Sequence, residues 1–217
     1  MTAVPGLMIQ KDGSYALTME CSNGCIEPAL LEKVAQAAKE QQAIVHLTTA
    51  QKLMFLGLDE ARAKALLETL ENEGAVFRKA RDLSHPRVCV GKPYCKLAFQ
   101  DTFELGDLLY KELARQPIPP KLKVAVSGCP ACCSWANLMD LGFMGVRSGY
   151  KVLIAGHGGA KPKIGQEIAT ITSPQEAVDI LKKLAEIFSQ EVKKKSRLER
   201  VVAKLGIDEI KNRLGLS

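Results

Sequence analysis

Two cysteine clusters constrain the fold of this 217-residue chain more than any other feature. The first, CVGKPYC, spans residues 89–95, and the second, SGCPACC, spans residues 127–133. Both clusters contain Gly and Pro, which are typical of loops, and loop backbone leaves N–H groups free to face sulfur. A cysteine is most often a small buried hydrophobic residue, but that role does not explain two clusters of this composition. We therefore expect the fold to bring two cysteine loops together around a common ligand.

The spacing of the cysteines leaves three kinds of site open. Structural zinc sites favour close pairs, which Cys129 and Cys132 provide but Cys89 and Cys95 do not. A thioredoxin-like Cys-Pro-Ala-Cys motif from Cys129 to Cys132 would leave Cys89, Cys95 and Cys133 unexplained. A [4Fe-4S] cluster takes four thiolates on a larger scale and gains from N–H groups directed at its sulfurs. The spacing favours the iron–sulfur cluster over zinc and over dithiol redox chemistry.

The composition is that of a globular chain with no membrane span and no nucleic-acid partner. Hydrophobic residues make up 47% and charged residues 25% of the chain. No apolar run approaches the roughly 20 residues of a membrane-spanning helix, and the N-terminus does not resemble a signal peptide. We therefore expect a cytoplasmic protein, in which clustered thiols stay reduced. The net charge of +6 suits an anionic substrate or cofactor, whereas 5% aromatic residues are too few to indicate base stacking.

The hydrophobic patterns predict an α+β fold in two parts. In the first part, residues 1–79, strand-like segments at 14–21 and 43–49 alternate with helical patterns at 27–42 and 59–74. Together they form a compact β-α-β-α half-domain.

The second part, residues 80–217, begins with the loop of the first cysteine cluster. Ser173 and Glu176 form a capping box at the start of a long helical pattern. The predicted elements are a helix at 102–116, a strand at 121–128, a hairpin over 139–159, and helices at 173–192 and 197–215.

The two cysteine motifs, C-x-G-x-x-x-C followed by C-P-x-x-C, resemble the cluster signature of the sirohaem-containing sulfite and nitrite reductases. The segments VHLTTAQ, PPKLKVAVSGC and AGHGGAKPKIG are similar to further parts of that family. The resemblance covers almost the whole chain and implies a small, single-repeat member. It implies a ferredoxin-like half-domain over residues 1–79, followed by an α/β domain over residues 80–217 that binds sirohaem and a [4Fe-4S] cluster. The implied activity is multi-electron reduction of sulfite to sulfide or of nitrite to ammonia, with a ferredoxin-like electron donor.

The resemblance also implies which cysteines bind metal. Cys89, Cys95, Cys129 and Cys133 would ligate the cluster. Cys133 would in addition bind the sirohaem iron, so that one thiolate carries electrons from the cluster to the haem. Cys132 is then not a ligand, although an exchange of roles between Cys132 and Cys133 stays open.

The resemblance implies a binding role for basic residues, because sirohaem carries many carboxylates and requires a positive pocket. Lys121 and Lys123 alternate on a predicted strand, so both point to one face, as surface lysines often do. The family places substrate-binding, proton-supplying lysines here, and we expect these two to be catalytic. The candidates for the sirohaem carboxylates, each equally an ordinary surface charge, are Arg87, Lys92, Arg147, Lys161 and Lys163.

The chain departs from the family pattern where arginines are expected. His46 and Ala50 stand in VHLTTAQ where the family has arginines, and Thr18, Met19 and Glu20 replace an arginine-bearing strand. His46 is then the remaining candidate there for contact with the cofactor or substrate. Fewer cations weaken the capture of a small anion. The alternative function is therefore an iron–sulfur electron-transfer or metal-binding protein without reductase activity, and a zinc-stabilised binding protein is a third.

Two expectations concern features outside the site. Cys21 and Cys25 flank a turn and have no counterpart in the family pattern, so we expect unrelated core and loop cysteines. Larger family members enclose the haem between two repeats, and we therefore predict that this single-repeat chain can form a homodimer to cover it.

Overall fold

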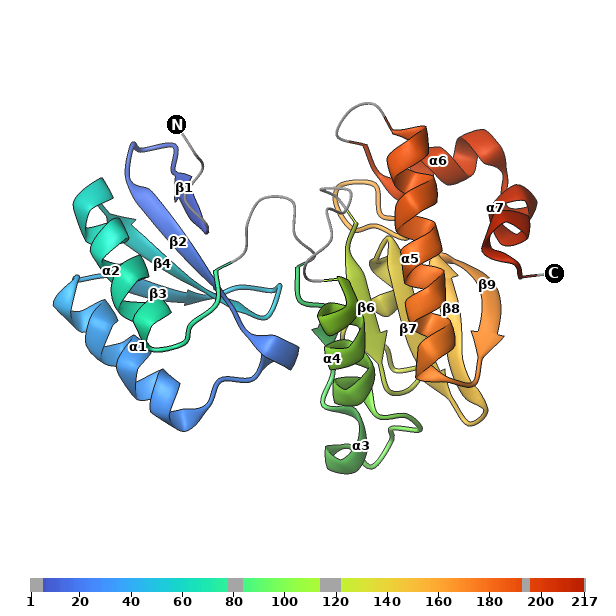
Figure 1. The fold of residues 1–217 in the computed structure, drawn as a ribbon, viewed down its shortest axis with the longest axis horizontal. Coiled ribbons are helices and arrows are strands. Elements are labelled where there is room, and N and C mark those ends of the chain that lie inside the picture. The colour runs from blue at the N-terminus through green and yellow to red at the C-terminus, as the bar shows by residue number, and fades with distance from the viewer. Residues whose placement is uncertain (1–5, 78–83, 114–121, 193–195, 217) are drawn as a thin grey trace. The chain divides into compact units, whose positions relative to one another are not determined.

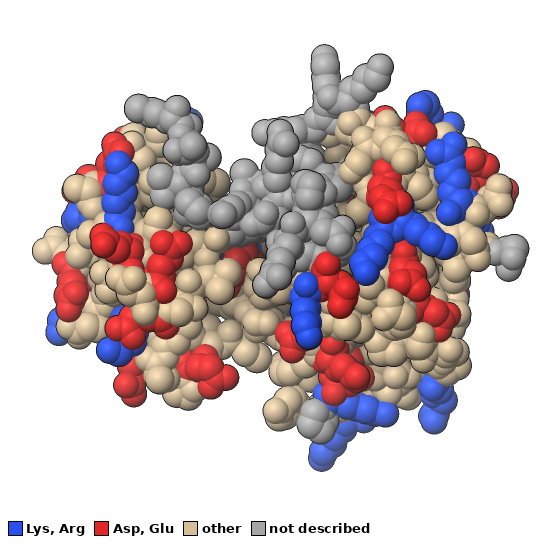
Figure 2. Space-filling model, in the orientation of Figure 1, with Lys and Arg blue, Asp and Glu red and all other residues tan. Residues whose placement is uncertain are grey.

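The computed structural model describes residues 6–77, 84–113, 122–192 and 196–216. The chain divides into two compact units, Met1–Ala80 and Arg81–Ser217, each with its own hydrophobic core (Figure 1). The predicted boundary between residues 79 and 80 falls outside the described residues. Charged side chains of both signs cover each unit (Figure 2). Within the described ranges, no helix is both long enough and apolar enough to cross a bilayer.

The first unit is a four-stranded antiparallel sheet with two helices. Its sheet has the order β1-β2-β4-β3. Leu17 and Phe55 from the sheet share one buried cluster with Val34 and Leu66 from the two helices. The elements are β1 (Leu7–Ile9), β2 (Tyr15–Glu20), a 3-10 turn η1 (Ser22–Gly24), α1 (Pro28–Glu40), β3 (Ile44–Leu47), β4 (Lys52–Leu58) and α2 (Glu60–Asn72).

The prediction of a β-α-β-α unit was incomplete, because it missed β1 and β4. The β4 sequence KLMFLGL is apolar at almost every position, so the alternation that identifies a half-buried strand is absent. The preceding residues Thr48–Gln51 form a turn, in which Gln51 has a φ of 60°. The turn reverses the chain and pairs β4 with β3, His46 opposite Met54.

The second unit is built on a five-stranded mixed sheet of order β5-β6-β7-β8-β9. Strands β5, β6 and β7 run parallel, whereas β7, β8 and β9 are antiparallel. The predicted hairpin is confirmed, with its turn at Arg147 and Ser148 between β7 and β8. The strands are β5 (Arg87–Val88), β6 (Val124–Ser127), β7 (Leu141–Val146), β8 (Gly149–Ile154) and β9 (Gln166–Ile171).

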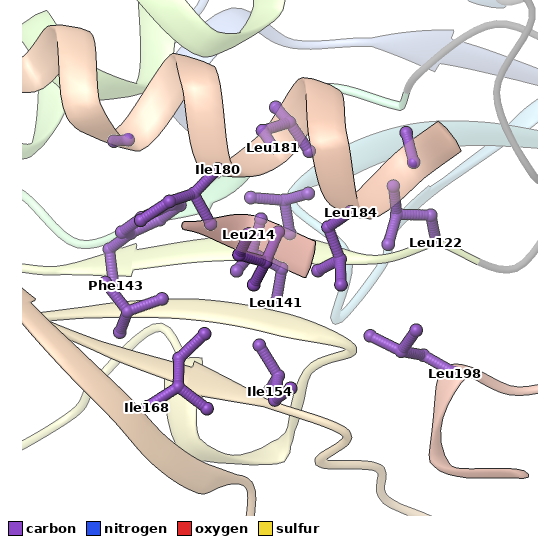
Figure 3. Packing of buried hydrophobic residues seen from close by; sticks show 14 of the residues in the cluster. Leu122, Leu141, Phe143, Ile154, Ile168, Ile180, Leu181, Leu184, Leu198 and Leu214 are labelled. Carbon is purple, nitrogen blue, oxygen red and sulfur yellow. The ribbon is translucent and has the colours of Figure 1, made fainter. Parts of the chain in front are cut away.

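Helices pack on this sheet and close its core. Ile180 and Leu184 of the long helix face Leu141 and Ile154 of the sheet (Figure 3). The predicted capping box at the start of this helix is confirmed. The predicted α+β class is confirmed as well. The helical elements are α3 (Gly91–Tyr94), α4 (Thr102–Leu113), a 3-10 turn η2 (Ala136–Leu138), α5 (Pro174–Glu191), α6 (Leu198–Leu205) and α7 (Ile207–Leu214).

Candidate metal centre

Both cysteine loops leave the same edge of the second sheet. Strands β5 and β6 are parallel neighbours, with Val88 opposite Val126, and Cys89 directly follows β5. The Cys89 N–H donates to the Val126 carbonyl at 3.2 Å, and Cys129 follows β6 after a single glycine. The carboxyl ends of parallel strands are where α/β sheets bind ligands. The parallel pairing therefore starts the two loops side by side.

Gly128 joins the two loops. Its N–H donates to the Cys89 Sγ at 3.1 Å, and its carbonyl accepts from the Phe99 N–H at 2.8 Å. A Cβ on Gly128 would lie 3.1 Å from the Gly91 Cα, so the close approach depends on glycine. A backbone N–H directed at a cysteine sulfur is the second-shell contact that orients and tunes a metal thiolate.

The short helix α3 ends just before Cys95, whose backbone is bonded back to Gly91 at the start of the helix. The Cys95 N–H donates to the Gly91 carbonyl at 2.8 Å, and the Lys92 N–H donates to the Gln100 carbonyl at 3.2 Å. Gly91 has a φ of 50°, and a Cβ there would lie 2.4 Å from the Thr102 Oγ1. The Thr102 hydroxyl donates to the Cys89 carbonyl. These contacts close the first cysteine loop on itself.

The thiols of Cys132 and Cys133 have opposite environments. Cys132 is buried, and its Sγ accepts from the Asn137 N–H at 3.4 Å and donates to the Asn137 Oδ1 at 3.4 Å. Its φ of 56° lies in the left-handed region that favours glycine. Cys133 is exposed. The thiol of Cys132 is thus bonded within its own loop, while that of Cys133 is accessible.

Two buried serines, Ser127 and Ser134, hold the second loop by hydrogen bonds, and neither was predicted as a site residue. The hydroxyl oxygens of Ser127 and Ser134 lie 2.6 Å apart, and Ser134 donates to the Val126 carbonyl at 2.9 Å. Ser127 also donates to the Cys132 Sγ at 3.7 Å. Buried hydroxyls are costly unless they are hydrogen-bonded, so this network restricts the loop to one conformation. The sequence signal that could have identified Ser127 is its position as the one polar residue at the end of the apolar strand β6.

The donor set fits an iron–sulfur cluster. All seven cysteines are free thiols, and five of them lie on the two loops that Gly128 joins: Cys89, Cys95, Cys129, Cys132 and Cys133. Among the described residues, no three His, Cys, Asp or Glu side chains are close enough to hold a single metal ion.

Arg87 and Trp135 form a pair beside the cysteine loops. The Arg87 guanidinium carbon lies 5.6 Å from the centroid of the Trp135 ring, within cation–π range. Burial lowers the pKa of Arg87, which still leaves the guanidinium charged at neutral pH. Trp135 has a φ of 60° and is 48% exposed.

The other cations of the second unit that were predicted to bind sirohaem carboxylates are exposed side chains, and one of them is already ion-paired. Lys92 and Arg147 are exposed, and the Arg147 guanidinium lies 5.3 Å from the centroid of the Phe99 ring. Lys161 is exposed as well. Lys163 donates to Glu199 at 3.0 Å.

The glycine-rich segment AGHGGAKPKIG, residues 155–165, adjoins the second cysteine loop. The Gly165 N–H donates to the Asn137 carbonyl at 2.8 Å, and His157 and Lys163 exchange two backbone hydrogen bonds of 2.9 Å. A Cβ on Gly156 would lie 2.6 Å from the Asn137 carbonyl oxygen. Lys161 and Lys163 therefore belong to a loop whose backbone is hydrogen-bonded to Asn137, just after the second cysteine loop.

Of the two predicted catalytic lysines, the one that the structure describes, Lys123, does not lie at the cysteine edge. Lys121 is outside the described residues. Lys123 precedes β6, so four strand residues, about 13 Å, separate it from the cysteine end of that strand. The Lys123 N–H donates to the Asp140 carboxylate at 3.1 Å, and burial raises the pKa of Asp140. His46 lies in the first unit, exposed on β3.

Two family models match the chain. The model described as "Nitrite and sulphite reductase 4Fe-4S domain" covers residues 79–217, and "Nitrite/Sulfite reductase ferredoxin-like half domain" covers residues 8–73. The chain belongs to the nitrite and sulphite reductase family. The membership confirms the predicted ferredoxin-like half-domain, the enzyme class of sulfite/nitrite-reductase-like oxidoreductase, and the cofactors, a [4Fe-4S] cluster and sirohaem.

Some relatives in the nitrite and sulphite reductase family have about the length of this chain, and others are several times longer. It is 28% identical over 209 residues to "Sulfite reductase, assimilatory-type" of Nitratidesulfovibrio vulgaris, covering 95% of both proteins. It is 28% identical to "Nitrite reductase (NADH) large subunit" of Escherichia coli, covering 96% of this chain but 26% of that protein. The solved Mycobacterium tuberculosis NirA protein shares the fold with a TM-score of 0.78 and 22% identity over 95% of this chain and 41% of that one.

Proposed function

We propose that this chain catalyses the multi-electron reduction of sulfite to sulfide or of nitrite to ammonia, with electrons from a ferredoxin-like donor. The observation that carries the proposal is the junction at Gly128, where the Cys89 sulfur accepts a backbone N–H from the start of the second cysteine loop. Relatives named as sulfite and nitrite reductases support the choice of substrates.

In this proposal Cys89, Cys95, Cys129 and Cys133 ligate the cluster, and the Cys133 thiolate is shared with the sirohaem iron. When bound, the two cofactors supply the electrons and the iron to which the anion binds. Cys133 is preferred to Cys132 because its thiol is exposed, whereas that of Cys132 is engaged by Asn137. Cys132 and the two buried serines then hold the loop in place.

We assign Arg87, Lys161, Lys163 and His46 to the sirohaem carboxylates. Arg87 has the strongest support: burial has already displaced much of its water, and no carboxylate among the described residues is paired with it. Such a cation gains most from an incoming carboxylate, because charge-assisted hydrogen bonds replace the lost hydration. Lys92 and Arg147, both exposed, are proposed for the same role.

Lys121 and Lys123 remain the proposed substrate lysines. Lys123 lies at the end of β6 away from the cysteines. The simpler arrangement is therefore one in which a second copy of the chain supplies the substrate lysines. A homodimer would supply that copy and cover the cofactor, as expected for a chain that spans 41% of the NirA protein. A mass equal to one chain for the cofactor-loaded protein in sedimentation would exclude this arrangement.

The absorption spectrum of protein purified without air tests the function. Sirohaem gives a Soret band and a far-red band, and we expect both, together with oxidation of a reduced viologen dye on addition of sulfite or nitrite. Cys133→Ser should lose the sirohaem bands, whereas Cys132→Ser, the matched control, should keep them. Equal loss in both variants would contradict the assignment of Cys133.

The second candidate is an electron-transfer protein that keeps the cluster without reducing substrate. The replacement of family arginines by His46 and Ala50 favours it. A broad iron–sulfur shoulder without a Soret band, and no dye oxidation with either anion, would support this candidate instead.

A further inference from the structure

The two cysteines outside the cysteine loops lie at the two ends of one turn in the first unit. Cys21 directly follows β2, and Cys25 directly follows η1. The Gly24 N–H donates to the Cys21 carbonyl at 3.1 Å, and the Cys25 N–H donates to the Ser22 carbonyl at 2.8 Å. These two overlapping hydrogen bonds reverse the chain, so the two cysteines are neighbours in space as well as in sequence.

The backbone of this turn has a defined, left-handed form. Its central residues, Asn23 and Gly24, have φ values of 53° and 72°. Asn-Gly is the pair that most readily adopts a tight turn with two left-handed residues. A Cβ on Gly24 would lie 3.0 Å from the Gln51 Nε2, so the turn also packs closely against the residue before β4. The resting protein therefore already holds the two cysteines together.

The two thiols of the turn have different environments. Cys21 is 6% exposed and belongs to the apolar cluster of the first unit, whereas Cys25 is exposed. The Cys25 thiol makes a long hydrogen bond of 3.8 Å to the Asn23 carbonyl. Burial raises the pKa of Cys21, the Leu53 N–H opposes this effect, and a charge on Cys25 raises the pKa of Cys21 further. The two sulfurs are thus close enough to interact, and one of them is accessible to a reagent.

We propose that Cys21 and Cys25 form a reversible disulfide when the chain meets a small-molecule disulfide such as oxidised glutathione. The exposed Cys25 thiolate attacks one sulfur of the small disulfide, which forms a mixed disulfide and releases one small thiolate. The Cys21 thiolate then attacks the Cys25 sulfur and expels the second small thiolate. The two protein thiols lose two electrons and two protons, and the small disulfide is reduced to two thiols.

The short loop makes this disulfide labile. A disulfide is commonly taken to stabilise a fold by restricting the unfolded chain, and this effect decreases with the length of the loop that it closes. Cys21 and Cys25 are only four positions apart, so their bond would add little stability, and the exposed Cys25 sulfur leaves it open to reduction. The pair therefore suits a modification that follows the thiol–disulfide balance of its surroundings. It does not depend on the proposed function, because the proposed cluster ligands all lie in the second unit.

Equilibration of the cofactor-loaded protein in buffers with an increasing ratio of oxidised to reduced glutathione tests the proposal. After an acid quench and unfolding in urea, free thiols are labelled with N-ethylmaleimide, and the peptide that contains both cysteines is weighed by mass spectrometry. We expect an unlabelled form that has lost two hydrogens to replace the doubly labelled form. Dithiothreitol should restore the doubly labelled form completely.

Two variants separate the pair from an ordinary exposed thiol. Cys25→Ser changes an exposed side chain, and its Cys21 should stay labelled at every glutathione ratio because the buried thiol has lost its partner. Cys21→Ala, checked for folding by circular dichroism, should accumulate the glutathione adduct of Cys25. The same adduct as the main product in the wild type, or two labels in the most oxidising buffer, would overturn the proposal. A wild type without cofactor bands would count against the proposed function alone, since the labels report on the first unit.

Discussion

The two units differ in where they place buried polar groups and unusual backbone. Among the described residues, four of the five buried polar side chains belong to the second unit, and three of these, Thr102, Ser127 and Ser134, support the cysteine loops. In the part of the first unit that the structure describes, Glu20 is the only buried polar residue. Left-handed non-glycine residues occur in both units: those of the first unit lie in turns, whereas in the second unit Cys132 and Trp135 lie at the second cysteine loop and Ala155 follows β8.

This difference shows which unit is built for chemistry. Buried polar networks and left-handed residues cost free energy and persist where the surrounding structure requires them. In the second unit most of them, Thr102, Ser127, Ser134, Cys132 and Trp135, support or belong to the cysteine loops. The first unit is a sheet and two helices joined by ordinary apolar packing.

The largest expected effect separates the cysteines of the two units. Cys129→Ser should abolish the cofactor absorption bands, because the proposed cluster loses one of its four thiolates. Cys25→Ser, an exposed cysteine of the first unit, should retain full bands in the same purification without air. Loss of the bands in Cys25→Ser would break the comparison, since it would give the first unit a direct part in the metal centre.

The next effect concerns the one buried charge of the first unit. Glu20 is ion-paired with Lys52, and their side chains are 2% and 12% exposed. Lys52→Met should lower the free energy of unfolding of this unit by about 3 kcal/mol, because a buried carboxylate loses its cation. Glu20→Gln in the same chain should recover most of the loss. Urea unfolding followed by circular dichroism measures both.

The same experiment locates the effect. The only tryptophan, Trp135, lies in the second unit, so its fluorescence follows that unit alone. The Trp135 transition should keep its midpoint in Lys52→Met. A shift equal to that of the circular dichroism signal would mean that the units unfold together.

A smaller loss of stability is expected in the second unit from Gly145→Ala. The new Cβ would lie 2.4 Å from the Gly128 carbonyl oxygen, so the cysteine loop must move. We expect a loss of about 2 kcal/mol in the Trp135 fluorescence transition, typical of overpacking. Gly158→Ala is the control, because a Cβ there meets nothing within 4 Å. A Gly145 variant as stable as this control would show that the loop adapts freely.

The smallest effect is a difference in reactivity between Cys21 and Cys25. Burial raises the pKa of the Cys21 thiol above its ordinary value of 9.0, so less thiolate is present at pH 8. Iodoacetamide should therefore modify exposed Cys25 first, and the rate at Cys21 should increase as the pH rises through its raised pKa. Mass spectrometry of the labelled peptide measures both rates. Equal rates in the folded protein would contradict the burial of Cys21.

Several features could be predicted from sequence because they depend on neighbouring residues. The capping box of Ser173 and Glu176 lies within one helical turn, and the hairpin joins β7 and β8, which follow one another directly in the sequence. Strand β4 could not be predicted in the same way, because its apolar residues show no alternation. The order and composition of the cysteine motifs carried the resemblance to the family, whereas their spacing alone only favoured a cluster over a single ion.

By itself, the sequence determined the family, the cofactors and the strand that leads into the second cysteine loop, but it did not predict β5 and α3 at the first. Only the tertiary structure decided that Gly128 donates to Cys89, that the Cys132 thiol turns toward Asn137, and that Lys123 lies at the far end of β6. These facts depend on the parallel pairing of β5 and β6, which brings together residues far apart in the chain. Local propensity does not contain that pairing, because it is selected by the packing of the whole core.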